Sequence, residues 1–510
     1  MSNLRQDWYR LIAVGNRSGG IGYFTCIGIF LLGLNLYAPA PPTILQRVLA
    51  SATAVLAFGV IWLWVYRADN EAEIGFLPIM TVVYFLEYPF TIFTQKFYQM
   101  NFGYGEYLLS NEAVDKALAL SLIGLPMIVL GFYWPGRKAI AEKLPRFQMK
   151  WRDRDVVEFM AVGFAIMSLA TFLIAFRIKL SDATQAYLSL PGEFFFLSLA
   201  TLFILQLQGQ LSFASKVLMW GVLIPLRVVL GMSQGTLALG MVVVMALAIT
   251  YATIRRRVPW IVFIIGFGGF VVLQPVKGDF RKTVFLKGTI NKDEPQSEKL
   301  AAFMNSAEVG WSVVQSFDLK DVVSIATARL SDILIFATVV ERTPQDTPYW
   351  YGASFYRLLF FPIPRILYPE KPNYLEGNVL GHQYAMIGDD DYVTSINLAQ
   401  LIELYGNFGP PGVIFGCLVF GIIYRTIHDC FVHPSCGLGS LVTGIYFFTH
   451  LIDIENSTAS IFGGLLLESI VVLIFFFSIR LAEEFCAGAR LRLRSAGSQE
   501  KVLATSARYR

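Results

Sequence analysis

The chain is 510 residues long and carries a formal net charge of +4, with 55% apolar residues, 15% charged residues and a mean hydropathy of +0.55. Soluble globular domains contain about 25% charged residues, so this composition excludes a soluble globular chain and indicates a membrane protein. Apolar stretches of about 18 to 22 residues, long enough to cross a hydrocarbon core of about 30 Å as helices, recur along most of the chain. We count about twelve, which begin near Ile21, Val48, Gly75, Ala117, Val156, Glu193, Ser212, Gln234, Val258, Gly409, Gly437 and Ser460.

The order of these stretches divides the chain into four regions. About nine spans lie in residues 1–274, a more polar loop covers 275–408, about three spans lie in 409–482, and 483–510 form a basic tail. The sequence therefore predicts an all-α polytopic membrane protein with about twelve transmembrane helices and one large loop.

Lysine and arginine in the short loops predict the orientation, because cations that flank a span are retained on the cytoplasmic side. Residues 135–155 hold seven Lys or Arg against three acids, three arginines stand at 255–257, and the segment from Arg480 onward holds seven Lys or Arg against three acids. Both termini are therefore expected in the cytoplasm, and the loop 275–408 is expected on the outer, periplasmic side.

The five cysteines predict neither disulfides nor a metal site. None lies in the outer loop, where an oxidising compartment would favour disulfides. The stretch HDCFVHPSC (428–436) holds two His and two Cys, but zinc sites usually separate their two ligand pairs by about a dozen residues. We favour a cytoplasmic hairpin there, and in the absence of a GxxxxGK loop we expect no cofactor.

The outer loop is acidic in sum but has one concentrated pair of cations. It holds twelve Lys or Arg and sixteen Asp or Glu, so we expect no nucleic-acid partner. Lys277 and Arg281 follow the ninth span and are four residues apart, which places them on one face of a continuing helix. Such a pair suits a pyrophosphate group, and ordinary interfacial snorkelling at a helix end is the alternative.

Two further stretches of the loop, 300–317 and 326–342, have apolar residues at helical spacing and predict surface helices. Arg329 and Asp332 are three residues apart in the second. We expect a local ion pair that lets a half-buried helix pack, with an arginine turned toward a ligand as the alternative.

The stretch FFPIPRILYPEKPNY (360–374) is too apolar for open water, and its four prolines prevent a continuous helix. Irregular backbone at membrane depth is tolerated only where protein or a wet cavity surrounds it, so we expect a re-entrant or interfacial segment. Its prolines would hold Arg365 and Lys371 on a stiff, extended ribbon. Cations fixed in this way suit recognition of an anionic lipid head group.

Four ionisable residues fall within or near the predicted spans, where a charge is costly unless it faces the bundle or a wet cavity. They are Glu87, Arg227, His450 and Glu468. For Arg227 and Glu468 we expect a structural pair, and a cavity for a lipid carrier is the alternative.

The stretch YGASFYRLLFFPIPRILYPEKPN (351–373) resembles the outer-loop signature of the O-antigen polymerases, the Wzy-type oligosaccharide repeat-unit polymerases. VKGDFRK (276–282) and LIELYGNFGPPGVIFG (401–416) fit the same family, and the resemblance extends from about residue 20 to 480 through the span count and the single large loop. A Gly-Ser-Arg-Gly turn of such polymerases is GMSQG (231–235) here, so no phosphate-binding role passes to Gln234.

The resemblance implies a metal-independent, GT-C-like glycosyltransferase of the bacterial inner membrane with its active site on the periplasmic face. Such an enzyme joins undecaprenyl-pyrophosphate-linked oligosaccharide repeats into O-antigen, capsule or exopolysaccharide chains of the lipopolysaccharide type. Its expected partners are the lipid-linked substrate, membrane lipids, a chain-length regulator and a flippase.

The transition state of such a transfer accumulates charge on the leaving pyrophosphate, which fixed cations must stabilise in the absence of a metal. Under the resemblance, the candidate pyrophosphate-binding residues are Lys277, Arg281, Arg329 and Arg365. The candidate catalytic residues are Glu403, Arg365, Lys371 and His382, with Glu403 as the proton acceptor and with His382 or the acids 389–391 as alternatives. Structural explanations remain open for three of these. Glu403 can be a first-turn acid favoured by the helix dipole, His382 a surface residue, and the acids 389–391 solvated loop charges.

Two other classes of protein remain open. A lipid-linked oligosaccharide flippase would also have about twelve spans, but it would favour short loops on both sides. A ligase that moves finished glycan to another acceptor shares its chemistry, carrier and compartment with a polymerase.

Overall fold

A computed structural model describes most of the chain. The described residues are 20–38, 43–66, 73–94, 99–102, 105–136, 139–140, 142–144, 146–177, 182–232, 238–281, 323–324, 326–327, 329–360, 368, 376–391, 394–432 and 436–508. In a few of these stretches, among them 275–281 and 491–508, the backbone alone is described.

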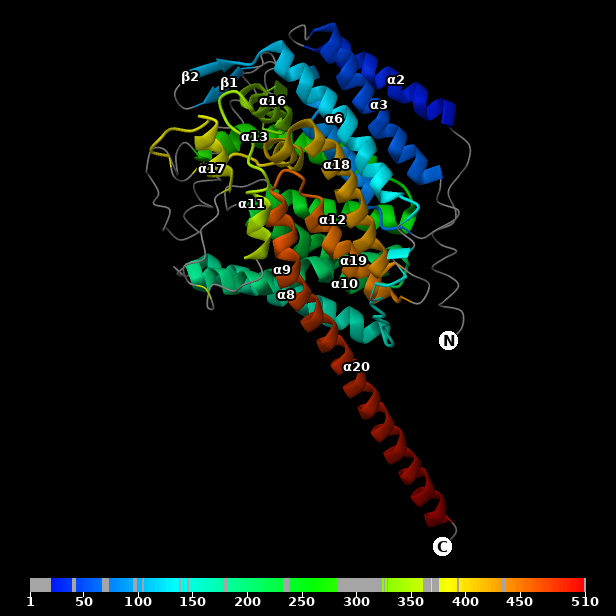
Figure 1. The fold of residues 1–510 in the computed structure, drawn as a ribbon. Coiled ribbons are helices and arrows are strands. Elements are labelled where there is room, and N and C mark those ends of the chain that lie inside the picture. Colours follow the sequence, from blue (N-terminus) through cyan, green and yellow to red (C-terminus); the bar gives the residue numbers. More distant parts are fainter. Residues whose placement is uncertain are drawn as a thin grey trace.

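Helices make up nearly all of the described architecture (Figure 1). In chain order the elements are α2 (Gly20–Tyr37), α3 (Ile44–Tyr66), α4 (Phe76–Glu87), α5 (Phe90–Thr94), β1 (Gln99–Phe102), β2 (Gly105–Leu108), α6 (Asn111–Phe132), α8 (Arg154–Arg177), α9 (Asp182–Leu207), α10 (Phe213–Leu218), the π-helical turn η2 (Met219–Leu223), α11 (Ile224–Met232), α12 (Ala238–Arg255), α13 (Trp260–Arg281), α16 (Asp332–Arg342), the 3₁₀ turn η4 (Phe355–Leu359), α17 (Glu376–Gln383), α18 (Gln400–Phe431), α19 (Leu438–Leu451) and α20 (Thr458–Arg508). The strands β1 and β2 form one antiparallel hairpin, in which Gln99 pairs with Leu108. The hairpin and α16 lie at one end of the bundle, and α20 projects from the opposite end toward the C-terminus (Figure 1).

Six of the described helices are long and apolar enough to cross a membrane, so the chain is a multi-pass helical membrane protein. They cover residues 44–65, 111–132, 154–173, 213–231, 400–431 and 458–490. Six shorter apolar helices, at 22–37, 76–87, 191–207, 240–255, 260–271 and 438–451, lie where the sequence predicts its remaining spans. The helical membrane class is thus confirmed, and the count of about twelve spans stays a prediction.

The backbones of α6 and α18 touch where the two helices cross. A Cβ atom on Gly131 would lie 2.1 Å from the carbonyl oxygen of Leu418, and one on Gly421 would lie 2.0 Å from that of Ile128. No side chain fits into such a gap, so glycine alone permits this approach. Small residues at close helix crossings are the usual means of packing in a bilayer, where water does not drive apolar helices together.

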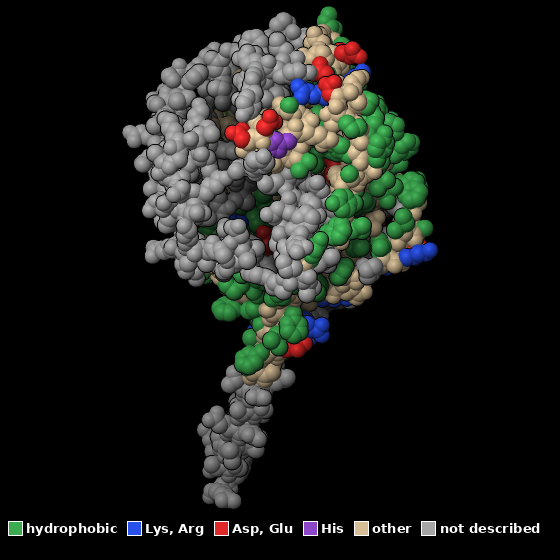
Figure 2. Space-filling model, turned by 60° about the vertical axis from the view of Figure 1, so that its left-hand side comes forward, with side chains coloured by type: hydrophobic (Ala, Val, Ile, Leu, Met, Phe, Trp, Pro, Cys, Tyr) green, Lys and Arg blue, Asp and Glu red, His purple; other side chains and the backbone are tan. Residues whose placement is uncertain are grey.

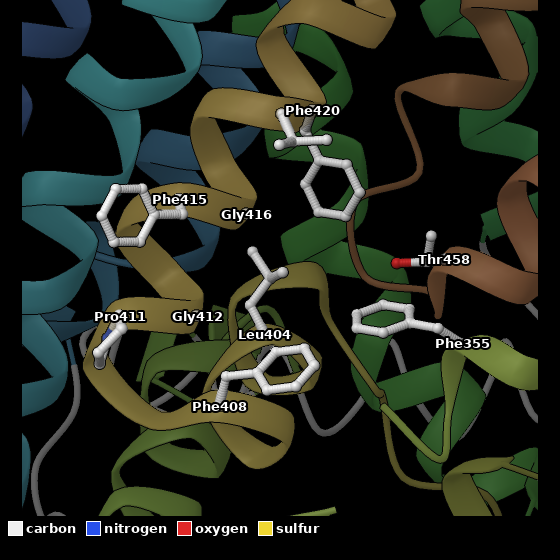
Figure 3. A pocket seen from close by; sticks show the side chains of 10 residues that line it. Phe355, Leu404, Phe408, Pro411, Gly412, Phe415, Gly416, Phe420 and Thr458 are labelled. Carbon is white, nitrogen blue, oxygen red and sulfur yellow. The ribbon is translucent and has the colours of Figure 1, made fainter. Parts of the chain in front are cut away.

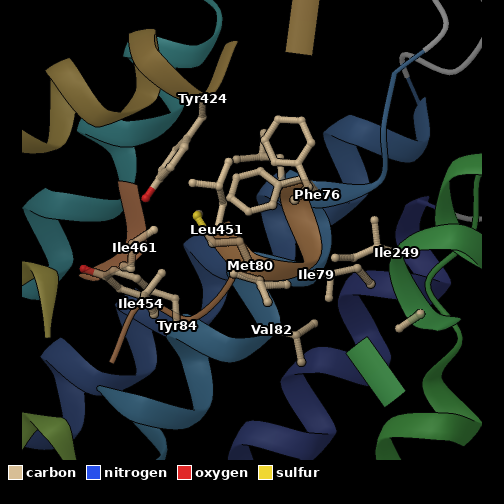
Figure 4. Close-up of a cluster of buried hydrophobic side chains, with 14 of the residues drawn as sticks. Phe76, Ile79, Met80, Val82, Tyr84, Ile249, Tyr424, Leu451, Ile454 and Ile461 are labelled. Atoms are coloured by element: carbon tan, nitrogen blue, oxygen red, sulfur yellow. The ribbon is translucent and has the colours of Figure 1, made fainter. Parts of the chain in front are cut away.

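The core lies between α4 and the later helices α12, α18, α19 and α20. Phe76 of α4 packs edge-to-face against Tyr424 of α18 at a ring-centroid distance of 5.0 Å and lies tilted against Phe448 of α19 at 4.5 Å. Figure 4 shows Met80, on the same helix, among these side chains. Aromatic pairs at these distances add about 0.5 to 1.5 kcal/mol beyond the burial of their surface.

Serine side chains define the starts of two helices. Ser110 accepts a hydrogen bond from the backbone N–H of Ala113 at 3.2 Å and begins α6, and Ser212 accepts one from Ser215 at 3.2 Å and begins α10. Each cap satisfies an N–H group that has no partner within its helix and stabilises the helix by about 1 kcal/mol.

A buried ionic cluster joins the C-terminal end of α18 to the segment before α4. Arg425 contacts Glu73 at 2.9 Å and Asp429 at 2.7 Å. His428 accepts a hydrogen bond from the N–H of Ile74 through Nε2 at 3.1 Å, so its Nδ1 carries the proton and donates to Asp429 at 2.9 Å. Among the residues described, no group of three or more His, Cys, Asp or Glu could hold a metal ion.

The predicted orientation can be tested with topology reporters. A reporter fused after Gln296 should register as periplasmic, and reporters fused after Lys143 or Ala487 as cytoplasmic, because cations retain their flanking segments inside. Paired alkaline phosphatase and fluorescent-protein fusions measure this. A cytoplasmic signal after Gln296 would contradict the placement of the outer loop.

Candidate functional site at the break of α18

The helix α18 consists of two helical segments joined at Gly409. This glycine has φ 64° and ψ −152°, a conformation that is essentially restricted to glycine. Pro410 and Pro411 follow, at positions where the second segment starts and where a missing N–H costs little. A Cβ atom on Gly409 would also lie 2.8 Å from the Tyr349 hydroxyl oxygen. The predicted start of a span near Gly409 corresponds to the second segment, while the first segment begins at Gln400.

Glu403 lies in the first segment of α18 and is fully buried, with 0% of its surface exposed. Its Oε2 accepts two hydrogen bonds from Thr458, one from the backbone N–H at 2.7 Å and one from the hydroxyl at 2.6 Å. The carboxylate therefore binds the first residue of α20 and lies in the first turn of α18, where the helix dipole favours an anion. Glu403 is thus a first-turn acid, as its structural explanation requires, and it also joins two helices at one point.

The residues just before the proline-rich stretch bind to this same segment of α18. The N–H of Trp350 donates to the carbonyl of Gly406 at 2.9 Å, and the N–H of Gly352 donates to Oδ1 of Asn407 at 2.8 Å. The Nδ2 of Asn407 donates to the Ser354 hydroxyl at 2.8 Å. The Asn-Phe-Gly stretch therefore fixes the position at which the proline-rich stretch begins.

An apolar groove of about 440 Å³ opens beside the break (Figure 3). Its lining comes from α18, η4 and the start of α20, and consists of Phe355, Leu404, Phe408, Pro411, Gly412, Phe415, Gly416, Val419, Phe420 and Thr458. Among these side chains Thr458 alone carries a hydroxyl, and that hydroxyl donates to Glu403. The groove can hold an apolar chain, and the buried carboxylate of Glu403 lies directly behind the Thr458 hydroxyl.

Arg329 lies near this site but does not pair with Asp332, so the expected local ion pair is wrong. Its Nη2 is 3.4 Å from Oδ1 of Asn397 and 3.9 Å from Oε2 of Glu455. Asp332 accepts from Nδ2 of Asn397 at 3.3 Å, and burial, with Glu455 as a like charge nearby, raises the pKa of Asp332 well above its usual range. Arg329 thus turns toward Asn397 and Glu455 rather than toward Asp332.

His382 and Asp391 form a separate contact. His382 lies in the last turn of α17, and its Nε2 is 3.1 Å from the backbone carbonyl of Asp391, so this nitrogen carries the proton. The carboxylate of Asp391 accepts from the N–H of Thr394 at 2.8 Å. Both groups thus shape the local loop, while Asp389 and Asp390 are exposed.

The remaining predicted cations are only partly covered by the structure. The backbone of α13 continues through Lys277 and Arg281, as the predicted helical turn requires, but their side chains are not described. Arg365 and Lys371 lie outside the described residues, as does the predicted helix 300–317.

A second polar cluster lies inside the bundle, and the expected pairing of Arg227 with Glu468 is wrong. Glu468 is 3.8 Å from Nδ1 of His450, whose Nε2 is 3.1 Å from Glu193. Tyr446 donates to Glu193 at 3.2 Å. The sequence pattern marks Glu193 only as the start of an apolar stretch, although a carboxylate in such a stretch is the signal that singled out Glu468.

The fold and these clusters define a multi-pass helical membrane protein with buried ionisable groups. The chain belongs to the family described as Domain of unknown function (DUF8712), whose model matches residues 74–431. That match includes α4 through α18, and hence Glu403 and the break at Gly409, while Thr458 and His450 lie beyond it. No curated protein and no solved structure matches the chain.

Proposed function

We propose that the protein is a GT-C-like polymerase that joins undecaprenyl-pyrophosphate-linked oligosaccharide repeats on the periplasmic face of the bacterial inner membrane. The observation that carries this proposal is the buried Glu403, which binds the hydroxyl of Thr458, a described residue that lines the apolar groove of about 440 Å³. A lipid-linked sugar needs both elements: an apolar surface for its chain, and a proton acceptor near the reacting hydroxyl.

In this proposal Thr458 relays a proton from the acceptor sugar to Glu403. The hydroxyl of Thr458 donates to Oε2 of Glu403, so its lone pairs remain for the O–H of an attacking sugar. As that sugar oxygen attacks the anomeric carbon, the bond to the pyrophosphate breaks and the proton passes through Thr458 to Glu403. The charge that develops on the leaving pyrophosphate is stabilised by five cations: Lys277, Arg281, Arg329, Arg365 and Lys371.

Deletion of the gene tests the reaction class. A strain without the polymerase should carry single repeat units on its carrier or final acceptor, and the length ladder of its glycans should vanish from a gel. Fractionation of lipid-linked intermediates separates the alternatives: long chains retained on the carrier indicate a ligase, and unextended units trapped on the cytoplasmic face indicate a flippase. Either of these two results contradicts the proposal.

A further inference from the structure

Arg227 is a buried cation in a membrane-crossing segment, and it forms no ion pair of hydrogen-bond length with any residue that the structure describes. It lies on α11, within the apolar stretch 213–231, and only 6% of its surface is exposed. Its Nε and Nη1 are enclosed, and among the residues that the structure describes none accepts a hydrogen bond from them. Since arginine stays protonated in proteins, a buried positive charge remains without an acceptor.

Two other buried arginines in the described part of the chain have oxygen acceptors, although Nε of Arg256, like that of Arg227, is enclosed without one. Arg425 contacts the carboxylates of Glu73 and Asp429, and Arg256 donates to the backbone carbonyl of Glu73 at 3.3 Å. Each of these two guanidinium groups thus has at least one protein oxygen as an acceptor, whereas none of the described residues provides one for Arg227. This difference indicates that the acceptor of Arg227 comes from outside the chain.

Three aromatic rings hold the guanidinium of Arg227 in place. Its Cζ atom lies 5.0 Å from the ring centroid of Phe172, 5.8 Å from that of Phe195 and 5.4 Å from that of Phe196. Rings at these distances stabilise a cation, but they do not replace the oxygen acceptors that N–H groups require. The cage therefore positions the guanidinium and leaves its hydrogen-bonding capacity unused.

The neighbouring carboxylate of Glu193 already binds His450 and Tyr446. His450 holds its Nδ1 3.0 Å from the carbonyl oxygen of Tyr446, which only accepts, so Nδ1 carries a proton. The contact of 3.1 Å between Nε2 and Oε2 of Glu193 then needs one more proton between the two atoms. With that proton the pair of Glu193 and His450 is neutral overall, and Glu468, 3.8 Å from Nδ1 of His450, is a further carboxyl of this cluster.

The position of Arg227 suits a ligand that enters from the outer leaflet. The crossing segment begins at Phe213 on the side predicted to be cytoplasmic, and Arg227 lies about 21 Å further along it at 1.5 Å per residue, in the outer third of a core about 30 Å thick. The side chains of Glu193 and His450 are partly exposed, by 31% and 21%. On the face drawn in Figure 2, a hollow with acidic and basic side chains inside it is visible.

We propose that Arg227 binds the phosphate group of an anionic lipid inside the bundle. The guanidinium offers two adjacent N–H groups to two phosphate oxygens, which is the geometry that distinguishes arginine from lysine. This inference goes beyond the polymerase proposal, because it requires no sugar transfer. The lipid is either a phospholipid or a polyprenyl phosphate, which present the same group.

Binding to the purified full-length protein tests this site. Native mass spectrometry in detergent would measure the affinity for undecaprenyl phosphate, for phosphatidylglycerol and for inorganic phosphate. We expect one of the two lipids to bind, and Arg227→Gln to weaken that binding about tenfold or more, as loss of charge-assisted hydrogen bonds does. The lipid affinity of Arg227→Lys should lie between those of the wild type and Arg227→Gln. Arg480→Gln, at an exposed arginine of α20, should bind lipid like the wild type.

Thermal unfolding separates binding from a structural role. If Arg227 binds lipid, added lipid should raise the unfolding temperature of the wild type but not that of Arg227→Gln. Three results would overturn the proposal: equal lipid affinity in wild type and Arg227→Gln, equal affinity for inorganic phosphate and lipid, or an equal lipid-induced rise in both proteins. If Arg227→Gln does not fold, the lipid affinity of Arg227→Lys tests the proposal instead. Wild-type affinity in the lysine variant would contradict a forked contact.

Discussion

Glu403→Gln is expected to abolish chain extension while the amount of protein in the membrane stays unchanged. A glutamine has the same shape and keeps an oxygen that accepts from both donor groups of Thr458, so the junction between α18 and α20 is preserved. It cannot take up a proton at the pH of the reaction. Loss of a general base costs about 100-fold to 10,000-fold in rate, which the glycan ladder of a complemented deletion strain would report.

Two matched controls accompany this variant. Thr458→Val should lose activity as well, because it removes the relaying hydroxyl, whereas Thr458→Ser should retain it. Glu112→Gln should have no effect, because Glu112 is also a first-turn acid but is exposed and pairs only with Lys116. Full activity of Glu403→Gln, together with a lower protein level, would make Glu403 a structural residue and remove the proton acceptor from the proposed mechanism.

Gly421→Leu is expected to prevent accumulation of folded protein. Its Cβ atom would lie 2.0 Å from the backbone carbonyl oxygen of Ile128, and a backbone group at a helix crossing cannot move aside as a side chain can. Overpacking of a core typically costs about 1 to 3 kcal/mol and occasionally more, and we expect the upper part of that range or beyond. Membrane protein level and monodispersity in detergent measure the effect.

Gly163 supplies the control for this experiment. It lies inside α8, and a Cβ atom there would meet nothing within 4 Å. Gly163→Leu should therefore leave the protein level near that of the wild type, apart from a small gain in helix propensity. Equal levels for the two variants would show that α6 and α18 do not pack as closely as described.

The positions of the apolar helices were accessible from the sequence, because a membrane span requires a long apolar run whatever surrounds it. The pairing of charges could not be predicted from the sequence. Arg329 and Asp332 share a helical spacing, yet the side chains that decide their partners, Asn397 and Glu455, come from distant parts of the chain. In the same way Glu468 faces His450 rather than Arg227, because helix rotation in the bundle selects the contact.

The candidate site was accessible only in part. Glu403 could be chosen from its position at the start of a predicted span, but its complete burial depends on Thr458, which is the first residue of another helix. The conformation of Gly409 could not be predicted, because the two prolines after it indicate the beginning of a span rather than a break within a helix. A sequence pattern locates an element, whereas the partner of a buried polar group is a property of the assembled bundle.

The close crossing of α6 and α18 also bears on the order of assembly during synthesis. The glycine face of α6 enters the membrane long before α18 has been translated, a delay of tens of seconds at about 5 to 20 residues per second. During that time Gly131 has no partner backbone to contact. A nascent chain with such an uncovered helix face is open to association with insertion factors or with neighbouring chains, so the yield of this protein should depend on how quickly its C-terminal helices follow.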